Sequence, residues 1–326
     1  MHILIVNNTS IPVTKYGGTE RVIWWLGKQL VQMGHQVSYL VAAGSHCDFA
    51  KVYVLNSSTP FNKQIPTGVD VVHINCEVNE TPNIPYIITR HGNSNDNKLL
   101  DINTVFVSKN HAQRFGSDSF VHNGIDPDDY GDPGLNTPRN YFHFLGDAAW
   151  RVKNVRGAIK IANKANVTLR VVGGVRFNFN QGIRLTFDPR IKFDGMKGGQ
   201  AKNEILKKSK GLIFPVLWHE PFGLSIVESL YFGCPVFGTP YGSLPEIVQP
   251  RVGFLSNNVS ELVNAIKNVN NYSKKDCYQH VMENFTSKQM ALNYLKKYET
   301  VLSGAHLNKT APLLQQIQTV KFLPFY

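Results

Sequence analysis

Short unbroken runs of apolar residues alternate along the chain with segments in which apolar residues recur at helical spacing. An unbroken run is typical of a strand in a parallel sheet, because both faces of such a sheet are buried. After the first run, residues 20–34 place apolar side chains three and four positions apart, and Gly34 suits the end of a helix. The apolar runs of this half are HILIVN (2–7), QVSYLVAA (36–43), VDVVHIN (69–75), PYIITRHG (85–92) and TVFVSKN (104–110), the last leading into a helix from His111.

The alternation pauses at GDPGLNTPRN, residues 131–140, and then starts again. Two prolines and two glycines within ten residues indicate a linker. Beyond it, strands are expected at 141–146, 167–174, 211–216 and 234–240, with helices at 155–165, 203–211, 224–233, 259–269 and 287–302.

Strands interleaved with helices predict right-handed crossovers and parallel sheets. We therefore expect an α/β protein with two doubly wound, Rossmann-like domains at residues 1–135 and 136–303, facing each other across a cleft. Ligands of such sheets bind outside the carboxyl ends of the strands. A tail follows at residues 304–326, with disorder, packing on the first domain and contact with a bilayer as open alternatives.

The composition is that of an ordinary globular protein. A chain of 326 residues with 42% hydrophobic content is long enough for two domains that each bury a core, and it excludes a disordered protein. The four cysteines form no C-x-x-C pair, so neither a zinc site nor a disulfide framework is expected. No run reaches the ~18 apolar residues of a membrane helix. These features predict a cytoplasmic protein that is at most peripheral at the inner face of a membrane.

The chain carries 34 basic and 23 acidic residues, a formal net charge of +11. A charge of this sign favours polyanions, which include nucleic acid, anionic lipid and phosphorylated substrates. The basic residues are dispersed and no nucleic-acid-binding motif is present, so nucleic acid is not expected as a partner.

Two nucleotide-binding fingerprints are absent. No G-x-G-x-x-G follows the first strand, which argues against a nicotinamide dehydrogenase. The G-x-x-x-x-G-K-S/T motif is also absent, which argues against a phosphate-loop NTPase. Instead Gly17 and Gly18 lie directly before a helix with Glu20 in its first turn. Glycine amides at a helix N-terminus can bind an anion, although a simple turn is the alternative.

The most informative segment is E-P-F-G-L-S-I-V-E, from Glu220 to Glu228. It spans a loop-to-helix junction in which Gly223 permits an unusual turn, and it places two carboxylates on one edge of the predicted sheet. The N–H groups of Phe222, Gly223 and Leu224 are the unpaired donors of the helix start. Carboxylates accept hydrogen bonds from sugar hydroxyls and amides donate to them, so this segment suits a polyhydroxylated, negatively charged ligand.

In its motifs the chain resembles the retaining GT-B glycosyltransferases of family 4. The resemblance covers nearly the whole chain, and the motifs occur in the order of the family. They are GGTER after the first strand, TRHG at 89–92, VHNGIDPDDY, VGGVRF, the E-x7-E segment after IFPVLWH, and GSLPEIV.

The resemblance implies an acceptor-binding first domain and a second domain that binds the nucleotide sugar. It implies catalytic roles for His91, which approaches the donor sugar, and Glu220, which contacts that sugar. It implies donor-binding roles for the diphosphate-side residues Gly17, Gly18 and Lys153, for the amides of Phe222, Gly223 and Leu224, and for Glu228 on the ribose hydroxyls. Taken alone, the position of His91 at a strand end favours a structural histidine, and a surface lysine is the alternative for Lys153.

Two positions depart from the family, one of them Asn154, which stands where a glycine usually follows the lysine. Where the family has Gly-Arg after the first strand of the second domain, this chain has Gly146–Asp147, and an aspartate does not neutralise a phosphate. Arg151 is the nearest candidate to supply the missing cation.

The expected activity is transfer of a hexose from a nucleoside-diphosphate sugar to a hydroxyl of a glycan or lipid-linked acceptor in surface polysaccharide or lipopolysaccharide synthesis. Uracil is the favoured base and guanine the rival. No metal and no cofactor is expected beside the donor substrate, and an anionic membrane surface is a candidate partner. The alternatives are a nucleotide-sugar epimerase or phosphorylase on the same fold and a non-enzymatic polyanion-binding protein.

Overall fold

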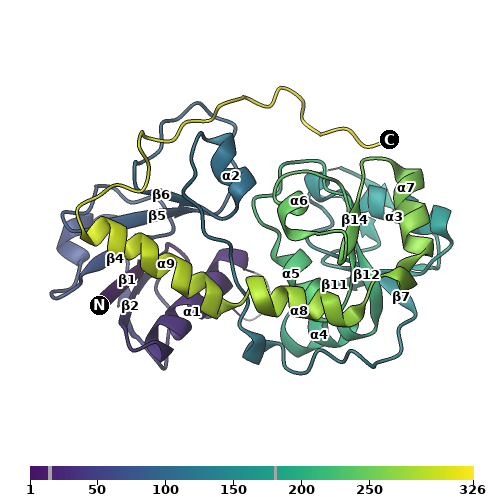
Figure 1. The fold of residues 1–326 in the computed structure, drawn as a ribbon, viewed down its shortest axis with the longest axis horizontal. Coiled ribbons are helices and arrows are strands. Elements are labelled where there is room, and N and C mark those ends of the chain that lie inside the picture. Colours follow the sequence, from purple (N-terminus) through teal and green to yellow (C-terminus); the bar gives the residue numbers. More distant parts are fainter. Residues whose placement is uncertain (14–16, 180–181) are drawn as a thin grey trace. The chain divides into compact units, whose positions relative to one another are not determined.

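The computed structural model describes residues 1–13, 17–179 and 182–326. It divides into two compact units. Among the described residues, unit 1 comprises 1–13, 17–126 and 286–318, and unit 2 comprises 127–285 and 319–326. Each unit is built around one six-stranded sheet (Figure 1).

The sheet of unit 1 is parallel throughout, with the strand order β3-β2-β1-β4-β5-β6. Every residue of β1 is buried, as expected for a strand covered on both faces. Edge strand β3 was not predicted, and its four residues are exposed or half-buried. The strands are β1 (His2–Val6), β2 (Gln36–Val41), β3 (Lys51–Val54), β4 (Val71–Ile74), β5 (Tyr86–Arg90) and β6 (Thr104–Phe106).

Helix α1 (Gly18–Gln32) starts at the predicted glycine pair and buries the predicted apolar face. Gly34 follows it with φ +86°, a left-handed conformation that favours glycine at a helix end. Helix α9 (Ser287–Leu302), although late in the sequence, packs on α1 and β5 of this unit (Figure 1). The remaining helices of unit 1 are α2 (Lys109–Arg114) and the short 3-10 helix η1 (Phe61–Gln64).

A buried polar network joins α9 to the sheet of unit 1. The ring nitrogens of His73 lie 2.8 Å from the hydroxyl of Tyr298 and 2.7 Å from that of Thr89. The Thr89 hydroxyl lies 3.0 Å from that of Tyr294. Satisfied polar groups of this kind fix the position of one element on another, because breaking a bond inside the core leaves a costly unpaired group.

The sheet of unit 2 is also parallel, with the order β11-β8-β7-β12-β13-β14. Two six-stranded parallel sheets with helices confirm the predicted α/β, doubly wound class. Strand β11 was missed because its polar residues interrupt the apolar run. The strands are β7 (Tyr141–Leu145), β8 (Leu169–Val172), β11 (Ile191–Gly195), β12 (Ser209–Phe214), β13 (Val236–Gly238) and β14 (Gly253–Leu255).

Between β8 and β11, a small antiparallel pair, β9 (Phe177–Asn178) and β10 (Arg184–Leu185), occupies the crossover. The helices of unit 2 include two that sequence periodicity placed closely, α3 and α5, and one that it missed, α8. They are α3 (Val155–Ala165), α4 (Gly199–Lys207), α5 (Leu224–Tyr231), α6 (Leu244–Ile247), α7 (Val259–Lys267) and α8 (Lys274–Asn284), with 3-10 turns η2 (Pro127–Asp129), η3 (Arg151–Lys153) and η4 (Val269–Asn271).

The division between the units differs from the expected one at 135/136. Unit 2 begins at Pro127, because the predicted linker is fastened to it. Arg139 of that stretch donates hydrogen bonds to the carbonyl oxygens of Phe232 (2.5 Å) and of Gly233 and Ser209 (both 2.9 Å). The tail is also divided, since residues up to 318 belong to unit 1 and residues from 319 belong to unit 2.

The buried histidines make stability depend on pH. Burial lowers the pKa of His73 and of His143 to about 3. Because both pKa values lie below the unfolded value of 6.5, the stabilising contribution is complete above that pH and is lost as the pH falls toward the folded values. We predict that the urea midpoint, followed by circular dichroism, falls between pH 7 and pH 5. His73→Gln should flatten this slope, and a midpoint that is constant over this range would contradict the prediction.

Candidate functional site

The E-x7-E segment forms the turn between β12 and α5 at the carboxyl edge of the unit 2 sheet. Gly223 is the N-cap of α5 and has φ +83°, which confirms the predicted need for glycine in this turn. The G-S-L-P loop at residues 242–245 is hydrogen-bonded to this segment. The amide of Ser243 donates to the carbonyl oxygen of Glu220 at 2.9 Å, and its hydroxyl donates to that of Phe222 at 2.7 Å.

Glu220 forms a buried ion pair with Lys153. The Lys153 Nζ lies 2.6 Å from Glu220 Oε2, and the side chains are 11% and 6% exposed. The indole N–H of Trp218 donates to the same oxygen at 2.9 Å. Lys153 and Glu220, two of the residues that the family resemblance assigns to the donor, are therefore in direct contact within unit 2.

Three aromatic rings surround the Lys153 ammonium. It lies 5.3 Å from the ring centroids of Trp150 and Phe214 and 5.2 Å from that of Trp218. Cation–π attraction at such distances stabilises a desolvated ammonium. The rings also exclude water, so the charge of Lys153 acts in a medium of low dielectric constant, where its interactions are stronger.

Glu228 is held by a second cluster on α5. Lys202 Nζ lies 2.5 Å from Glu228 Oε1, and the hydroxyl of Tyr130 donates to the same oxygen at 2.6 Å. The Lys202 ammonium also lies 5.1 Å from the Tyr130 ring centroid. These side chains are buried, with Lys202 at 7% and Glu228 at 3% exposure.

The residues between the two glutamates differ in their surroundings. Phe222 is buried and its ring lies 6.0 Å from that of Phe285, so its side chain anchors the turn in the core. Leu224 is the first residue of α5. The N–H groups at this start have no acceptor within the helix. That the amides of Phe222, Gly223 and Leu224 donate to a ligand stays a prediction.

One of the positions that depart from the family, Asp147, is now defined. Asp147 Oδ1 accepts a hydrogen bond from the amide of Ala149 at 2.9 Å, so its carboxylate shapes the loop after β7. Arg151 is exposed, and its guanidinium carbon lies 4.8 Å from the ring centroid of Phe322 in the C-terminal segment. Arg151 and Phe322 both line a cavity of about 280 Å³ in unit 2. That Arg151 replaces the missing arginine stays a prediction.

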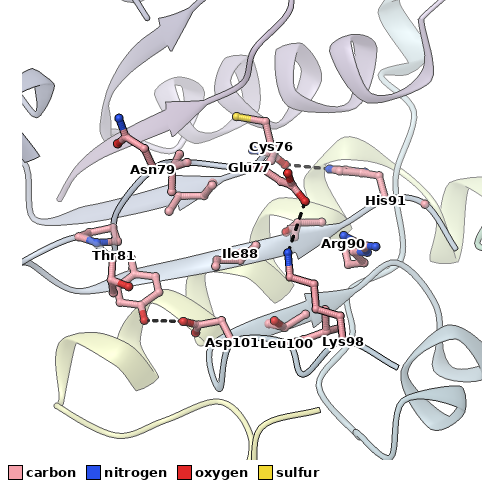
Figure 2. A pocket seen from close by; sticks show the side chains of 18 of the residues that line it. Cys76, Glu77, Asn79, Thr81, Ile88, Arg90, His91, Lys98, Leu100 and Asp101 are labelled. Carbon is pink, nitrogen blue, oxygen red and sulfur yellow. Dashed lines mark hydrogen bonds and ion pairs between the residues drawn. The ribbon is translucent and has the colours of Figure 1, made fainter. Parts of the chain in front are cut away.

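Unit 1 contains a larger cavity, of about 690 Å³, at the carboxyl ends of β4 and β5 (Figure 2). His91 lines it, and the ring Nε2 lies 2.8 Å from Asn75 Oδ1. Asn75 Nδ2 lies 3.3 Å from the carbonyl oxygens of Val6 and His73, which orients the Asn75 oxygen toward His91. His91 Nε2 therefore carries the proton and donates it. Burial lowers the pKa of His91 to about 4, so the ring is neutral at pH 7.

Gly17 and Gly18 lie at the N-terminus of α1 in unit 1. A Cβ on Gly17 would lie 2.7 Å from Glu20 Oε2 and 2.9 Å from Val13 Cγ2, so this close turn has no room for a side chain. The carbonyl oxygen of Gly17 accepts a hydrogen bond from Arg21 Nε at 3.1 Å.

Sequence reasoning missed the partners of the glutamates. Trp218 lies two residues before Glu220, within the motif itself, and its indole was the available signal. Lys202 and Tyr130 carry no such signal, because they reach Glu228 from elements 26 and 98 residues away in the sequence. Among the described residues, no group of three or more His, Cys, Asp or Glu side chains is placed to hold a metal ion.

The sequence model of the family described as "Glycosyl transferases group 1" matches residues 139–271. This range holds both ion pairs and lies within unit 2. Residues 139–271 are thus similar in sequence to the group 1 glycosyl transferases. No curated protein sequence matches the chain significantly.

Solved glycosyltransferase structures share the fold of the whole chain. The chain aligns with AviGT4, a glycosyltransferase involved in avilamycin A biosynthesis, at a TM-score of 0.75 and 18% identity, covering 94% of this chain and 99% of that one. Sucrose-phosphate synthase from Thermosynechococcus elongatus aligns at 0.71 and 16%, covering 93% and 100%. Anabaena Alr3699/HepE in complex with UDP-glucose aligns at 0.61 and 17%, covering 93% and 100%. The chain thus has the GT-B fold of these glycosyltransferases.

The buried Lys202–Glu228 pair generates a prediction. Glu228→Gln leaves the Lys202 ammonium buried without its carboxylate, which destabilises a protein by ~3–5 kcal/mol. We expect a lower free energy of unfolding in urea, and the double variant Lys202→Met/Glu228→Gln should recover part of the loss because the uncompensated charge is gone. A double variant that loses the sum of the two single effects would show that the pair is not coupled.

Proposed function

We propose that this enzyme transfers a hexose from a nucleoside-diphosphate sugar, with UDP as the nucleotide, to a hydroxyl of a glycan or lipid-linked acceptor. The observation that carries the proposal is the buried Lys153–Glu220 pair at the carboxyl edge of the unit 2 sheet. This edge is where doubly wound sheets bind their ligands. The pair supplies the two groups that a sugar diphosphate needs, a cation for phosphate and a carboxylate for hydroxyls.

Lys153 stabilises the leaving group. Negative charge accumulates on the nucleoside diphosphate as the glycosidic bond breaks, and a preorganised ammonium in a dry site lowers the energy of that transition state. The three rings around Lys153 hold the ammonium in place before substrate binds. When the diphosphate pairs with Lys153, Glu220 Oε2 is released to accept hydrogen bonds from the donor sugar.

The remaining donor contacts come from the turn and from α5. The amides of Gly223 and Leu224 donate to the sugar and phosphate oxygens, supported by the dipole of the helix. Glu228 accepts from the ribose hydroxyls, while Lys202 and Tyr130 orient its carboxylate through Oε1. Arg151 and the glycine pair of α1 are further candidates for the diphosphate.

His91 takes part as a neutral ring. With the proton on Nε2 and shared with Asn75, its Nδ1 is left as an acceptor for a substrate hydroxyl. The proposed reaction retains the anomeric configuration by attack on the face of the departing diphosphate, whose oxygen takes the proton of the acceptor hydroxyl. The proposal assigns no step to a metal or a cofactor.

Uracil as the base of the donor is supported by the family resemblance and by the likeness to a structure solved with UDP-glucose. GDP is the rival. We expect UDP at a hundred times its dissociation constant to stabilise the folded protein by ~2.7 kcal/mol, measured as a rise of the melting temperature, with ADP as the matched control. If GDP alone stabilises the protein, the base of the donor is guanine and not uracil. If no nucleoside diphosphate shifts the melting temperature, the proposal is contradicted.

Removal of the Glu220 carboxylate separates an enzyme from a polyanion binder. Glu220→Gln keeps the shape of the side chain and is expected to lower sugar transfer by ~100-fold or more, because a transition-state contact is lost. Glu283→Gln, at an exposed residue of unit 2, is the control that should retain activity. A Glu220→Gln variant with full turnover would contradict the assignment. An epimerase would release a sugar product without any acceptor.

We further propose that the acceptor belongs to surface polysaccharide or lipopolysaccharide synthesis and that the protein rests on an anionic membrane surface. The net charge of +11 supports this, since anionic lipid attracts basic surfaces. None of the described helices combines the length and hydrophobicity needed to cross a bilayer. Phosphatidylglycerol vesicles should sediment the protein at low salt and release it at high salt. Protein that stays in the supernatant at low salt would indicate a soluble acceptor.

A further inference from the structure

The cavity of unit 1 has one wall formed by alternate residues of β5. Successive side chains of a strand point to opposite faces, so Tyr86, Ile88 and Arg90 share a face. All three line the cavity, together with His91 that follows the strand (Figure 2). The guanidinium of Arg90 is therefore part of the cavity wall next to the residue assigned to the reacting centre.

Arg90 has no partner of its own among the described residues. Neither a hydrogen bond nor an ion pair joins its guanidinium to another side chain there, and its Nε is buried without an acceptor. A buried donor without a partner costs free energy, which a ligand that supplies an oxygen acceptor recovers. A planar guanidinium matches the two oxygens of a carboxylate or a phosphate.

The surroundings of Arg90 do not neutralise it. Arg114, on α2, donates to Asn93 Oδ1 at 2.7 Å and has no carboxylate partner within the described residues. His111, buried between Phe106 and Phe115, has its pKa lowered to about 3 by burial and by the nearby Arg114 and Arg90, and is therefore neutral at pH 7.

The acidic side chains of the same cavity are engaged elsewhere. Asp101 accepts from the hydroxyl of Tyr86 at 2.8 Å and from the amide of Asn103 at 2.7 Å. Glu80 accepts from the amide of Asn62 at 2.7 Å. Glu77, which is 87% exposed, lies 3.8 Å from Lys98 Nζ (Figure 2). Among the described residues that line the cavity, Arg90 is thus a cation without an acidic partner, whereas Lys98 lies beside Glu77.

We propose that Arg90 selects an acceptor sugar that carries an anionic group, a carboxylate or a phosphate monoester. The inference rests on the proposed function, since it takes the cavity of unit 1 as the acceptor site. Arg90 and His91 line the same cavity, so one ligand bound there can contact both. The anionic group therefore lies on the sugar that receives the hexose or on the sugar next to it.

The test is an NMR titration of the full-length protein in saturating UDP with glucuronic acid, glucose 6-phosphate and glucose. We expect at least one anionic sugar to bind at least tenfold more tightly than glucose, and Arg90→Gln to reduce its affinity to that of glucose. Preference for glucuronic acid identifies a carboxylate, and preference for glucose 6-phosphate identifies a phosphate. Lys51→Gln removes one positive charge from unit 1 outside the cavity and should leave the preference unchanged.

Three results would overturn the inference: wild-type protein that binds glucose as well as both anionic sugars, wild-type protein that binds neither anionic sugar, or an Arg90→Gln variant that keeps the preference. The melting shift with UDP in the same samples separates this failure from that of the proposed function. An intact shift without anionic preference rejects only the role of Arg90. The same shift reports whether Arg90→Gln is folded, and Arg90→Lys, which keeps the charge but not the planar fork, should retain a weakened preference.

Discussion

A buried ammonium or carboxylate is stable only when it is paired with an opposite charge, and unit 2 contains two such ion pairs around the short helix α5. Lys153 meets Glu220 before α5, and Lys202 meets Glu228 within it. Desolvation of each charge is costly, so each pair persists only because rings and hydroxyls complete its surroundings. The proposed binding of an anion and a polyol depends on these two buried pairs.

Two histidines of unit 1, His73 and His91, are buried as neutral groups, in contrast to the buried ion pairs of unit 2. Burial keeps His73 and His91 unprotonated, and each ring is oriented by hydrogen bonds to neighbouring side chains. A neutral histidine whose tautomer is fixed by Asn75 offers a defined acceptor to a hydroxyl without adding a charge to the cavity. This division suits a reaction in which the nucleotide is strongly anionic and the attacking group is an alcohol.

The sequence predicted those features that depend on local pattern. Continuous apolar runs identified β1 and β7, helical spacing identified α3 and α9, and the left-handed turn at Gly223 followed from the need for glycine before α5. Features set by distant contacts were not predicted. The attachment of Arg139 moved the domain boundary, and the partners of Glu228 come from remote elements.

The departure at Asp147 shows the same limit. The residue type alone indicated a lost phosphate contact. The hydrogen bond from the Ala149 amide to Asp147, which shapes the loop, is seen only in the structure. The contact between Arg151 and the Phe322 ring likewise joins residues that are far apart in the sequence, so no local sequence pattern predicts it.

A crystal structure of the protein with UDP-glucose would test the central claim most directly. The account predicts that the diphosphate contacts Lys153, that Glu220 leaves this ammonium to accept from the sugar hydroxyls, and that the ribose lies on Glu228. A nucleotide bound elsewhere, with the Lys153–Glu220 pair still closed, would contradict it.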